Sequence, residues 1–229
     1  MTGKYITRHL ARMTVWVLAV FVLQVQAADS EWEVGITGDL PYVMVNHRGI
    51  PVRIQRIQDT GNRLVDDFSK TSRPCPPFCI HPLEAAPGVQ TLGELELLEF
   101  LKSDVETGHG LLIDARMPNW YESETIPGAI NIPFVIFTTE SGKRDKILSL
   151  LGVVRGETGL LDFSAAQELA LFCNGPWCDQ SPRAIKGLIS AGYPPEKLNY
   201  FRGGMQSWKM FGLTTVLPTS HAVGESKEK

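Results

Sequence analysis

From Val89 onward the sequence alternates between two hydrophobic periodicities, and this alternation limits the possible folds more than any other feature. Short apolar runs typical of strands occupy residues 111–115, 129–134, 168–173 and 198–204, the last ending in a turn. Helical spacing is found at 91–104, 143–151, 164–167, 182–191 and 205–211, with Thr91 and Glu94 as an expected capping box. Strands alternating with helices predict an α/β fold with a mainly parallel sheet covered on both faces.

The run FCNGPWCDQSPRA places Cys173 at the end of an apolar strand, before a glycine-containing loop and the start of a helix. In open α/β sheets this end of a strand faces the crevice where ligands bind. The backbone N–H groups of such a loop and the positive end of the helix favour anions, and they favour a thiolate over a thiol. Cys173 is therefore a candidate nucleophile. The spacing alone leaves a buried structural cysteine as the alternative.

Three separated segments resemble the rhodanese (sulfurtransferase) homology domain over residues 89–216. They are LLIDARMPNWY…IPGAINIPF, FCNGPWCDQSPRA and YFRGGMQSWKMFGL, in the family's order. The resemblance implies a rhodanese-like parallel sheet of five strands flanked by helices. It also implies an enzyme, a sulfurtransferase whose loop cysteine takes sulfane sulfur from a small anionic donor such as thiosulfate. The persulfide on that cysteine would pass the sulfur to a thiol, a thiol protein or cyanide.

The resemblance and the position of the loop define the site residues that we expect. Cys173 and Cys178 are the catalytic candidates, and Asp114, Cys75 and Cys79 are expected to be structural. Residues expected to bind the donor are Arg116, Asn174, Gly175, Pro176, Trp177, Asp179 and Gln180. We expect neither a cofactor nor a metal ligand at this site. The chain departs from the family pattern at Trp120, at Glu124-Thr125 and in a loop about two residues longer after Cys173.

Cys178, five residues after Cys173, allows more than one chemistry. Its thiol could resolve a persulfide on Cys173 and release sulfide, or protect the nucleophile by reversible oxidation. A permanent disulfide between the two would instead prevent sulfur transfer. Two other functions therefore remain open: a periplasmic thiol–disulfide redox protein that uses Cys173 and Cys178, and a non-catalytic module that binds sulfur or metal.

The motif CPPFC holds a second cysteine pair, Cys75 and Cys79, in a segment with five prolines and little apolar content. A disulfide would close a small ring and order this segment. A dithiol that exchanges with the loop cysteines is a second interpretation. A metal site that includes His81 is a third, because thiolates and imidazole suit copper or zinc.

The first 27 residues have the pattern of a cleaved signal peptide, with Lys4, Arg8 and Arg12 before the apolar run 13–23 and small residues at its exit. We therefore expect a periplasmic or otherwise exported protein without a stable membrane span after cleavage. Residues 28–88 are expected to form a β-rich extension and a Pro/Cys linker, 89–216 the rhodanese-like domain and 217–229 a polar tail.

The overall charge argues against one class of partner. The formal net charge is −3 and the isoelectric point about 6.0, without a basic cluster longer than a pair. We therefore expect no nucleic acid partner.

Overall fold

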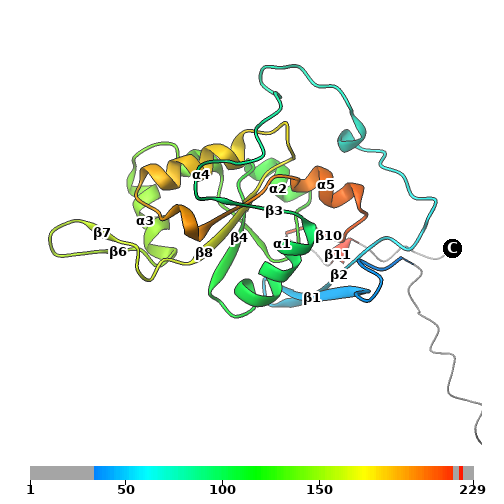
Figure 1. Ribbon diagram of the computed structural model, residues 1–229, viewed down its shortest axis with the longest axis horizontal. Helices are drawn as coiled ribbons and strands as arrows, with labels where there is room; N and C mark the ends of the chain where they lie inside the picture. Colours follow the sequence, from blue (N-terminus) through cyan, green and yellow to red (C-terminus); the bar gives the residue numbers. More distant parts are fainter. Residues whose placement is uncertain (1–33, 219–221, 224–229) are drawn as a thin grey trace, which may run out of the picture. The chain divides into compact units, whose positions relative to one another are not determined.

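The computed structural model describes residues 34–218, and the backbone of residues 222 and 223 (Figure 1). The expected signal peptide lies outside the described residues, as do residues 28–33 of the expected extension and most of the expected polar tail. Among the described residues, no helix combines the length and apolar character needed to cross a bilayer.

A five-stranded sheet forms the centre of the structure. Its strands are β3 (Gln90–Leu92), β4 (Gly110–Asp114), β5 (Ala129–Asn131), β8 (Glu168–Phe172) and β9 (Leu198–Phe201). Their order across the sheet is β3-β9-β8-β4-β5, and every neighbouring pair is parallel. The expected α/β fold with a parallel sheet of five strands is confirmed.

Helices follow the strands and cover the sheet. They are α1 (Glu94–Phe100), α2 (Pro118–Ser123), α3 (Gly142–Leu150), α4 (Gln180–Ser190) and α5 (Gly204–Met210). A π-helical turn (Leu101–Val105) extends α1, and 3-10 turns occur at Asp67–Ser69, Phe134–Ile136 and Pro195–Lys197. Of the expected helices, three match α3, α4 and α5 to within two residues at each end.

The central strand β8 shows why the sheet is buried on both faces. Its side chains alternate between the faces because the strand repeat is two residues. Ala170 and Phe172 pack in one core with α1 and α5, and Leu169 and Leu171 pack in the other with α3 and α4. A strand buried on both faces needs a continuous apolar run, and ELALF supplies one.

The N-terminal part of the expected β-rich extension forms a β hairpin. Strands β1 (Tyr42–His47) and β2 (Ile50–Gln55) are antiparallel, and Arg48 and Gly49 at the turn both have positive φ, as a two-residue hairpin turn requires. The apolar face of the hairpin belongs to the same core as α1, α5 and β8. It consists of Val43, Val45, Val52 and Ile54.

Two sequence-based expectations are wrong. The helix expected from Thr91 begins at Glu94, because Thr91 belongs to β3. The expected capping box between Thr91 and Glu94 is not formed, and the backbone N–H of Gly93 donates instead to the side chain of Glu96 at 3.1 Å. Residues 164–167 form a turn and not a helix, since the carboxylate of Asp162 accepts from the N–H of Ser164 at 2.9 Å and the segment is too short to sustain helical hydrogen bonding.

Two antiparallel strand pairs were not expected from the sequence. They are β6 (Val154–Arg155) with β7 (Leu161–Asp162), and β10 (Thr215–Val216) with β11 (Ala222–Val223). Each strand has only two residues, too few for a recognisable alternation of polar and apolar side chains.

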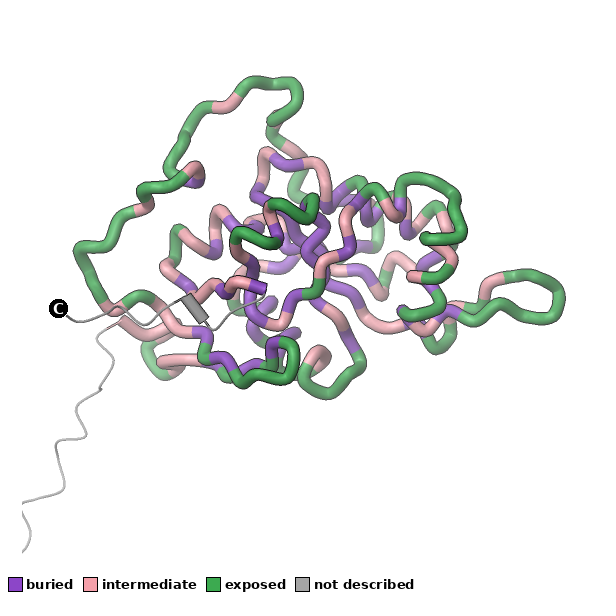
Figure 2. Tube along the Cα trace, turned by 180° about the vertical axis from the view of Figure 1, so that it is seen from behind, coloured by how far each residue is buried: buried purple, intermediate pink, exposed green. Residues whose placement is uncertain are grey.

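Between β2 and β3 the chain leaves the sheet and runs as a long arc past the helices (Figure 1). We call residues 66–82 of this arc the strap. Phe68 is buried in the core near the start of the strap, whereas none of residues 69–84 is buried, and Figure 2 shows this part of the tube mostly in the colour of exposed residues. The strap is therefore attached at its ends and largely open to solvent between them.

Candidate active site

Cys173 follows β8 directly and lies at the carboxyl end of the sheet, where the sequence placed it. The first turn of α5 holds the start of its loop: the N–H of Met205 donates to the carbonyl of Cys173 at 3.0 Å, and the N–H of Gln206 donates to that of Asn174 at 2.9 Å. Gly204 allows this approach because its φ is 54° and a Cβ there would lie 2.3 Å from the carbonyl oxygen of Cys173.

The sulfur of Cys173 lies among hydrogen-bond donors. The hydroxyl of Ser181, in the first turn of α4, donates to the sulfur at 3.1 Å. Burial alone raises the pKa of Cys173, but hydrogen bonds from the Cys178 thiol, from the hydroxyl and N–H of Ser181 and from the N–H of Gly175 outweigh it. The pKa of Cys173 therefore lies below that of an ordinary thiol, and the thiolate is favoured.

Cys178 is the second sulfur of the site, and it differs from Cys173 electrostatically. Both cysteines are free in the structure, so the permanent disulfide considered from the sequence is not formed. The hydrogen bond to Cys173, burial and the Cys173 charge all raise the pKa of Cys178. One thiol of the pair is thus favoured as the anion and the other as its proton donor. In its neutral form Cys173 donates to the carbonyl of Cys178 at 3.2 Å.

Arg116 lies behind the loop in a buried network. Its guanidinium binds the carboxylate of Asp114 at 2.6 Å, and neither side chain is exposed. It also donates to the carbonyl of Glu124 at 2.6 Å and to the side chain of Asn174 at 3.3 Å, while the hydroxyl of Thr125 donates to Asp114. Arg116 was expected to bind substrate. In this structure no part of it is exposed, and its contacts position Asn174 at the start of the loop.

The other expected site residues lie along the loop and at the start of α4. The indole N–H of Trp177 donates to Gln206 at 2.6 Å, and Pro176 presents its carbonyl to the strap. Asp179 immediately precedes α4 and is 3.7 Å from Arg183 in an exposed ion pair. Gln180 begins α4, and its side-chain oxygen is buried without a hydrogen-bond partner among the described residues.

The strap packs against this loop. Cys75 and Cys79 form a disulfide in it, and between them Phe78 meets Trp177 edge to face at 5.5 Å. The guanidinium of Arg73 stacks on the indole of Trp177 at 3.8 Å. The N–H of His81 donates to the carbonyl of Pro176 at 2.9 Å. The second cysteine pair is thus beside the first, although the sequence separates them widely.

Metal binding finds no support in the part of the chain that the structure describes, where no group of three or more His, Cys, Asp and Glu side chains is arranged to hold an ion. His81, the third ligand in the metal interpretation of the CPPFC pair, has its Nε2 buried and without a hydrogen-bond partner among the described residues. A disulfide between Cys75 and Cys79 also removes the two thiolates on which that interpretation rested.

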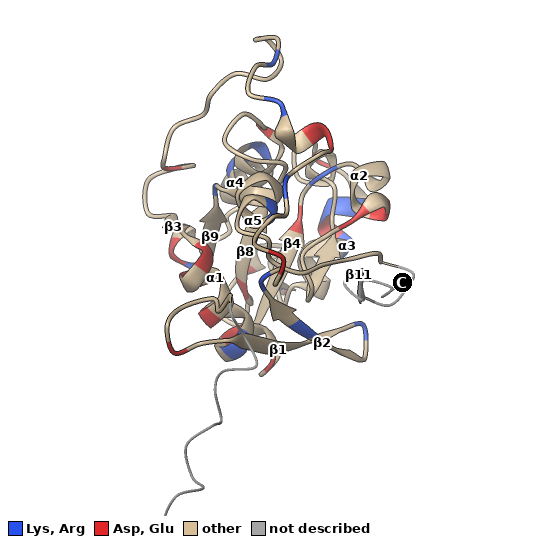
Figure 3. Cartoon of the chain, turned by 90° about the vertical axis from the view of Figure 1, so that its right-hand side faces the viewer, with Lys and Arg blue, Asp and Glu red and all other residues tan. Residues whose placement is uncertain are grey.

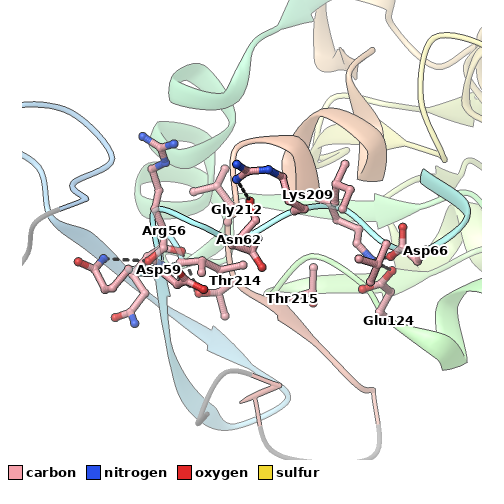
Figure 4. Close-up of a pocket in the computed structure, with 16 residues that line it drawn as sticks. Arg56, Asp59, Asn62, Asp66, Glu124, Lys209, Gly212, Thr214 and Thr215 are labelled. Atoms are coloured by element: carbon pink, nitrogen blue, oxygen red, sulfur yellow. Dashed lines mark hydrogen bonds and ion pairs between the residues drawn. The ribbon is translucent and has the colours of Figure 1, made fainter. Parts of the chain in front are cut away.

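A cavity of about 650 Å³ lies at the other end of α5, and Figure 4 shows Lys209 there between Asp66 and Glu124. None of the four cysteines lines it. Its walls combine apolar side chains with charged groups, of which Lys209 pairs with Asp66 and Glu124. The residues that line it include Gln55, Arg56, Asp59, Asn62, Gly212, Thr214 and Thr215.

A model of the rhodanese-like domain family matches residues 97–211, half of the chain. The chain belongs to the rhodanese-like domain family. The match covers the sheet strands β4, β5, β8 and β9, the Cys173 loop and α5, whereas the hairpin and the strap precede it. The sequence analysis of this rhodanese-like protein did not identify Ser181, whose hydroxyl donates to the Cys173 sulfur. Its position in the first turn of the helix after the loop could have indicated that contact.

Several known proteins are similar to part of this chain. An HTH-type transcriptional regulator of Mycobacterium tuberculosis is 28% identical over 108 residues, which are 47% of this chain and 38% of the regulator. The thiosulfate sulfurtransferase of Pseudomonas aeruginosa is 19% identical with a TM-score of 0.41, covering 63% of this chain and 23% of that one. A rhodanese from E. coli solved with anions is 23% identical with a TM-score of 0.31, covering 47% and 96%.

Proposed function

We propose that this rhodanese-like protein is a sulfurtransferase that carries sulfane sulfur as a persulfide on Cys173. The observation that carries the proposal is the set of hydrogen bonds converging on the Cys173 sulfur, which lower its pKa despite burial. A thiolate is the form of cysteine that attacks a sulfur–sulfur bond. The family supplies the reaction class, and the loop supplies the nucleophile in its reactive state.

The reaction proceeds in two exchanges with thiosulfate as donor. The Cys173 thiolate attacks the outer sulfur, a new sulfur–sulfur bond forms, and the bond in thiosulfate breaks so that sulfite leaves with the electron pair. The hydrogen-bond donors around Cys173, namely Ser181 and the N–H of Gly175, then face a persulfide anion. An acceptor thiolate attacks its outer sulfur, takes it as a new persulfide and restores the Cys173 thiolate.

Cys178 supports a second candidate, thiol–disulfide exchange. Its thiol is hydrogen-bonded to Cys173, so the two sulfurs are close enough to exchange a proton. Attack by Cys178 on the inner sulfur of the persulfide would release sulfide and leave a Cys173–Cys178 disulfide. The same pair could reduce a substrate disulfide with no sulfane sulfur at all. We rank this second because the raised pKa of Cys178 disfavours its thiolate.

One mass experiment separates these functions. The reduced full-length protein is mixed with thiosulfate, desalted and analysed intact and after digestion. Sulfur transfer predicts a gain of about 32 Da, one sulfur atom, on Cys173. Cys173→Ser should abolish the gain, and Cys178→Ser should preserve or prolong it. No gain together with disulfide reductase activity that needs both thiols contradicts the transferase and favours the redox protein.

We propose an exported, periplasmic setting for this activity. It is supported by the Cys75–Cys79 disulfide, since oxidising compartments preserve such bonds, and by the signal-like pattern of residues 1–27. Cell fractionation with N-terminal sequencing of the exported protein tests it. A chain found only in the cytoplasm with residues 1–27 retained would contradict the proposal.

Nucleic acid is not among the partners we propose. Acidic and basic residues are interspersed over the described part of the chain (Figure 3), so the charge pattern offers no specific support for such binding. A small anionic donor and a thiol acceptor remain the partners that the proposed reaction needs.

A further inference from the structure

The strap is anchored at both ends and meets the Cys173 loop in between. At its start, the carbonyl of Phe68 accepts from the side chain of Gln206 at 2.8 Å. At its end, the guanidinium of Arg202 donates to the carbonyls of His81 at 2.8 Å and Pro82 at 3.0 Å. The exposed middle carries few buried apolar contacts, which is the property of segments that open locally at low cost.

With the strap in this position, the two loop cysteines are closed off. Cys173 is 2% exposed and Cys178 is 6% exposed. The strap packs on the loop that separates the two cysteines, where Arg73 stacks on the ring of Trp177 and Phe78 meets that ring edge to face. A sulfur donor must reach the Cys173 sulfur, so some part of this cover has to move during turnover.

The loop itself has no positively charged side chain to add to its backbone N–H groups as a partner for an anionic donor. Residues 174–180 contain no Lys or Arg and carry the acidic Asp179. Arg116 is fully buried with Asp114 as its counter-ion. The strap brings a cation to the loop instead: the side chain of Arg73 is only 10% exposed, stacks on Trp177, and shares Asp67 with Lys70, so this cluster keeps one net positive charge.

Several buried polar side-chain atoms without hydrogen-bond partners belong to the strap, to α4 after the Cys173 loop and to β9 beside β8. Of the seven such side-chain atoms in the described residues, four lie in the strap, in α4 or in β9: Arg73 Nε, His81 Nε2, Gln180 Oε1 and Tyr200 OH. Tyr200 is 1% exposed, and the charges of Cys173 and Cys178 both act on its hydroxyl. Unpaired buried polar groups are costly, and a bound ligand is one way to satisfy them.

We propose that the strap is a lid that opens to admit the anionic sulfur donor and closes over it, with Arg73 as the positive partner of the donor and the hydroxyl of Tyr200 as a second contact. The identity of the donor rests on the proposed function. The lid is attached at Phe68 and at His81–Pro82, and the disulfide between Cys75 and Cys79 keeps Phe78 in place against Trp177.

The lid is tested first without any sulfur transfer. Iodoacetamide, which is small and uncharged, alkylates Cys173 of the full-length protein, and the rate is measured on the alkaline plateau, where changes in thiolate fraction do not contribute. Phe78→Ala removes an edge-to-face contact and should raise the plateau rate severalfold, up to about tenfold. Arg63→Gln is the matched control, because the guanidinium of this linker arginine donates to the carbonyls of Gly61 and Asn62 and, among the described residues, to no group of the Cys173 loop. Equal rates for wild type and Phe78→Ala overturn the lid.

The donor contacts are tested by steady-state kinetics with thiosulfate. Arg73→Gln should raise KM about tenfold, the size expected for one lost charge-assisted contact, with kcat changed less than twofold. Arg63→Gln should leave KM unchanged. Phe78→Ala keeps the charge, so its KM should rise less than that of Arg73→Gln. An unchanged KM in Arg73→Gln overturns the assignment of this residue.

Tyr200→Phe tests whether the Tyr200 hydroxyl contacts the sulfur donor or only binds an ordered water molecule. A donor contact predicts a higher KM for thiosulfate and an unchanged or higher Tm of the free protein, since the hydroxyl has no protein partner. A lower Tm with an unchanged KM means that only water binds there and overturns the contact. If wild type takes no sulfur from thiosulfate, the proposed function fails, whereas the alkylation experiment still decides whether the strap is a lid.

Discussion

Ser181 donates its hydroxyl hydrogen to the sulfur of Cys173 across 3.1 Å, although eight residues separate them in the chain. The two meet because the loop after β8 turns back and α4 begins at Gln180. The first turn of α4 thereby places both a hydroxyl and a backbone N–H of Ser181 against the sulfur. Burial opposes ionisation of Cys173, so these donors decide the charge of the site.

Ser181→Ala should raise the pKa of Cys173, because the hydroxyl donates to the thiolate and burial remains. Below the midpoint of the pH–rate profile, alkylation of Cys173 should slow roughly tenfold, the effect of one hydrogen bond to a charged group. The profile is measured with iodoacetamide, with Ser190→Ala at the far end of α4 as control. A midpoint that does not move in Ser181→Ala contradicts this role.

Cys178→Ala and Cys178→Ser test the hydrogen bond between the thiols. The Cys178 thiol helps to lower the pKa of Cys173, so its removal in Cys178→Ala should raise that pKa. A serine hydroxyl can still donate, and Cys178→Ser should therefore give a smaller rise. Ultraviolet absorbance of the thiolate, followed during a pH titration, measures both. A pKa of Cys173 in Cys178→Ala that is no higher than in wild type would show that the thiol does not act as a donor.

Local sequence signals predicted the part of the site that local structure builds. Cys173 ends a continuous apolar strand and precedes a glycine loop and a helix, and these features are readable within one stretch of chain. The hairpin was predictable for the same reason, since Val43, Val45, Val52 and Ile54 recur at every second position on either side of a turn at Arg48 and Gly49. The spacing of apolar residues predicts each helix or strand because the buried side chains recur with the repeat of that element.

Contacts between distant segments were not predictable from such signals. Nothing near Trp177 in the sequence indicates that Arg73 and Phe78 pack on its ring. The role of Arg116 was also not resolved, because an arginine at a strand end can face substrate or a buried carboxylate, and only the fold shows Asp114 as its partner. The helix start was misplaced by three residues because Thr91 and Leu92 pair with the distant strand β9, a contact that the local pattern does not show.

The buried pair of Asp114 and Arg116 should behave as one unit in stability measurements. Arg116→Met leaves a buried carboxylate without its counter-ion and should lower the free energy of unfolding by about 3–5 kcal/mol. Asp114→Leu combined with Arg116→Met removes both charges, so the double variant should be more stable than Arg116→Met alone. Urea denaturation measures wild type, both single variants and the double variant. Additive losses in the double variant would contradict an interaction between the two side chains.

His47 gives the protein a predictable loss of stability in mild acid. It lies at the end of β1, is 4% exposed, and its Nδ1 accepts a hydrogen bond from the N–H of Gly128 at 3.2 Å. Burial, and then the charge of Arg48, lower its pKa below the usual 6.5. The unfolded chain therefore binds more protons than the folded protein as the pH falls past about 6.5, and folding becomes less favourable from there down to the folded pKa.

Substitution of His47 tests this pH dependence. Urea midpoints measured at pH values on both sides of the usual histidine pKa should fall toward acid in wild type and fall less in His47→Gln, whose side-chain oxygen can still accept from Gly128 and does not titrate. His109→Gln is the control, because that exposed histidine bonds to Thr107 beside it and should leave the wild-type slope unchanged. Equal slopes in wild type and His47→Gln would assign the acid sensitivity to other groups. If the urea midpoint depends less on pH in His47→Gln and not in His109→Gln, the acid sensitivity belongs to the contact between His47 of the hairpin and Gly128.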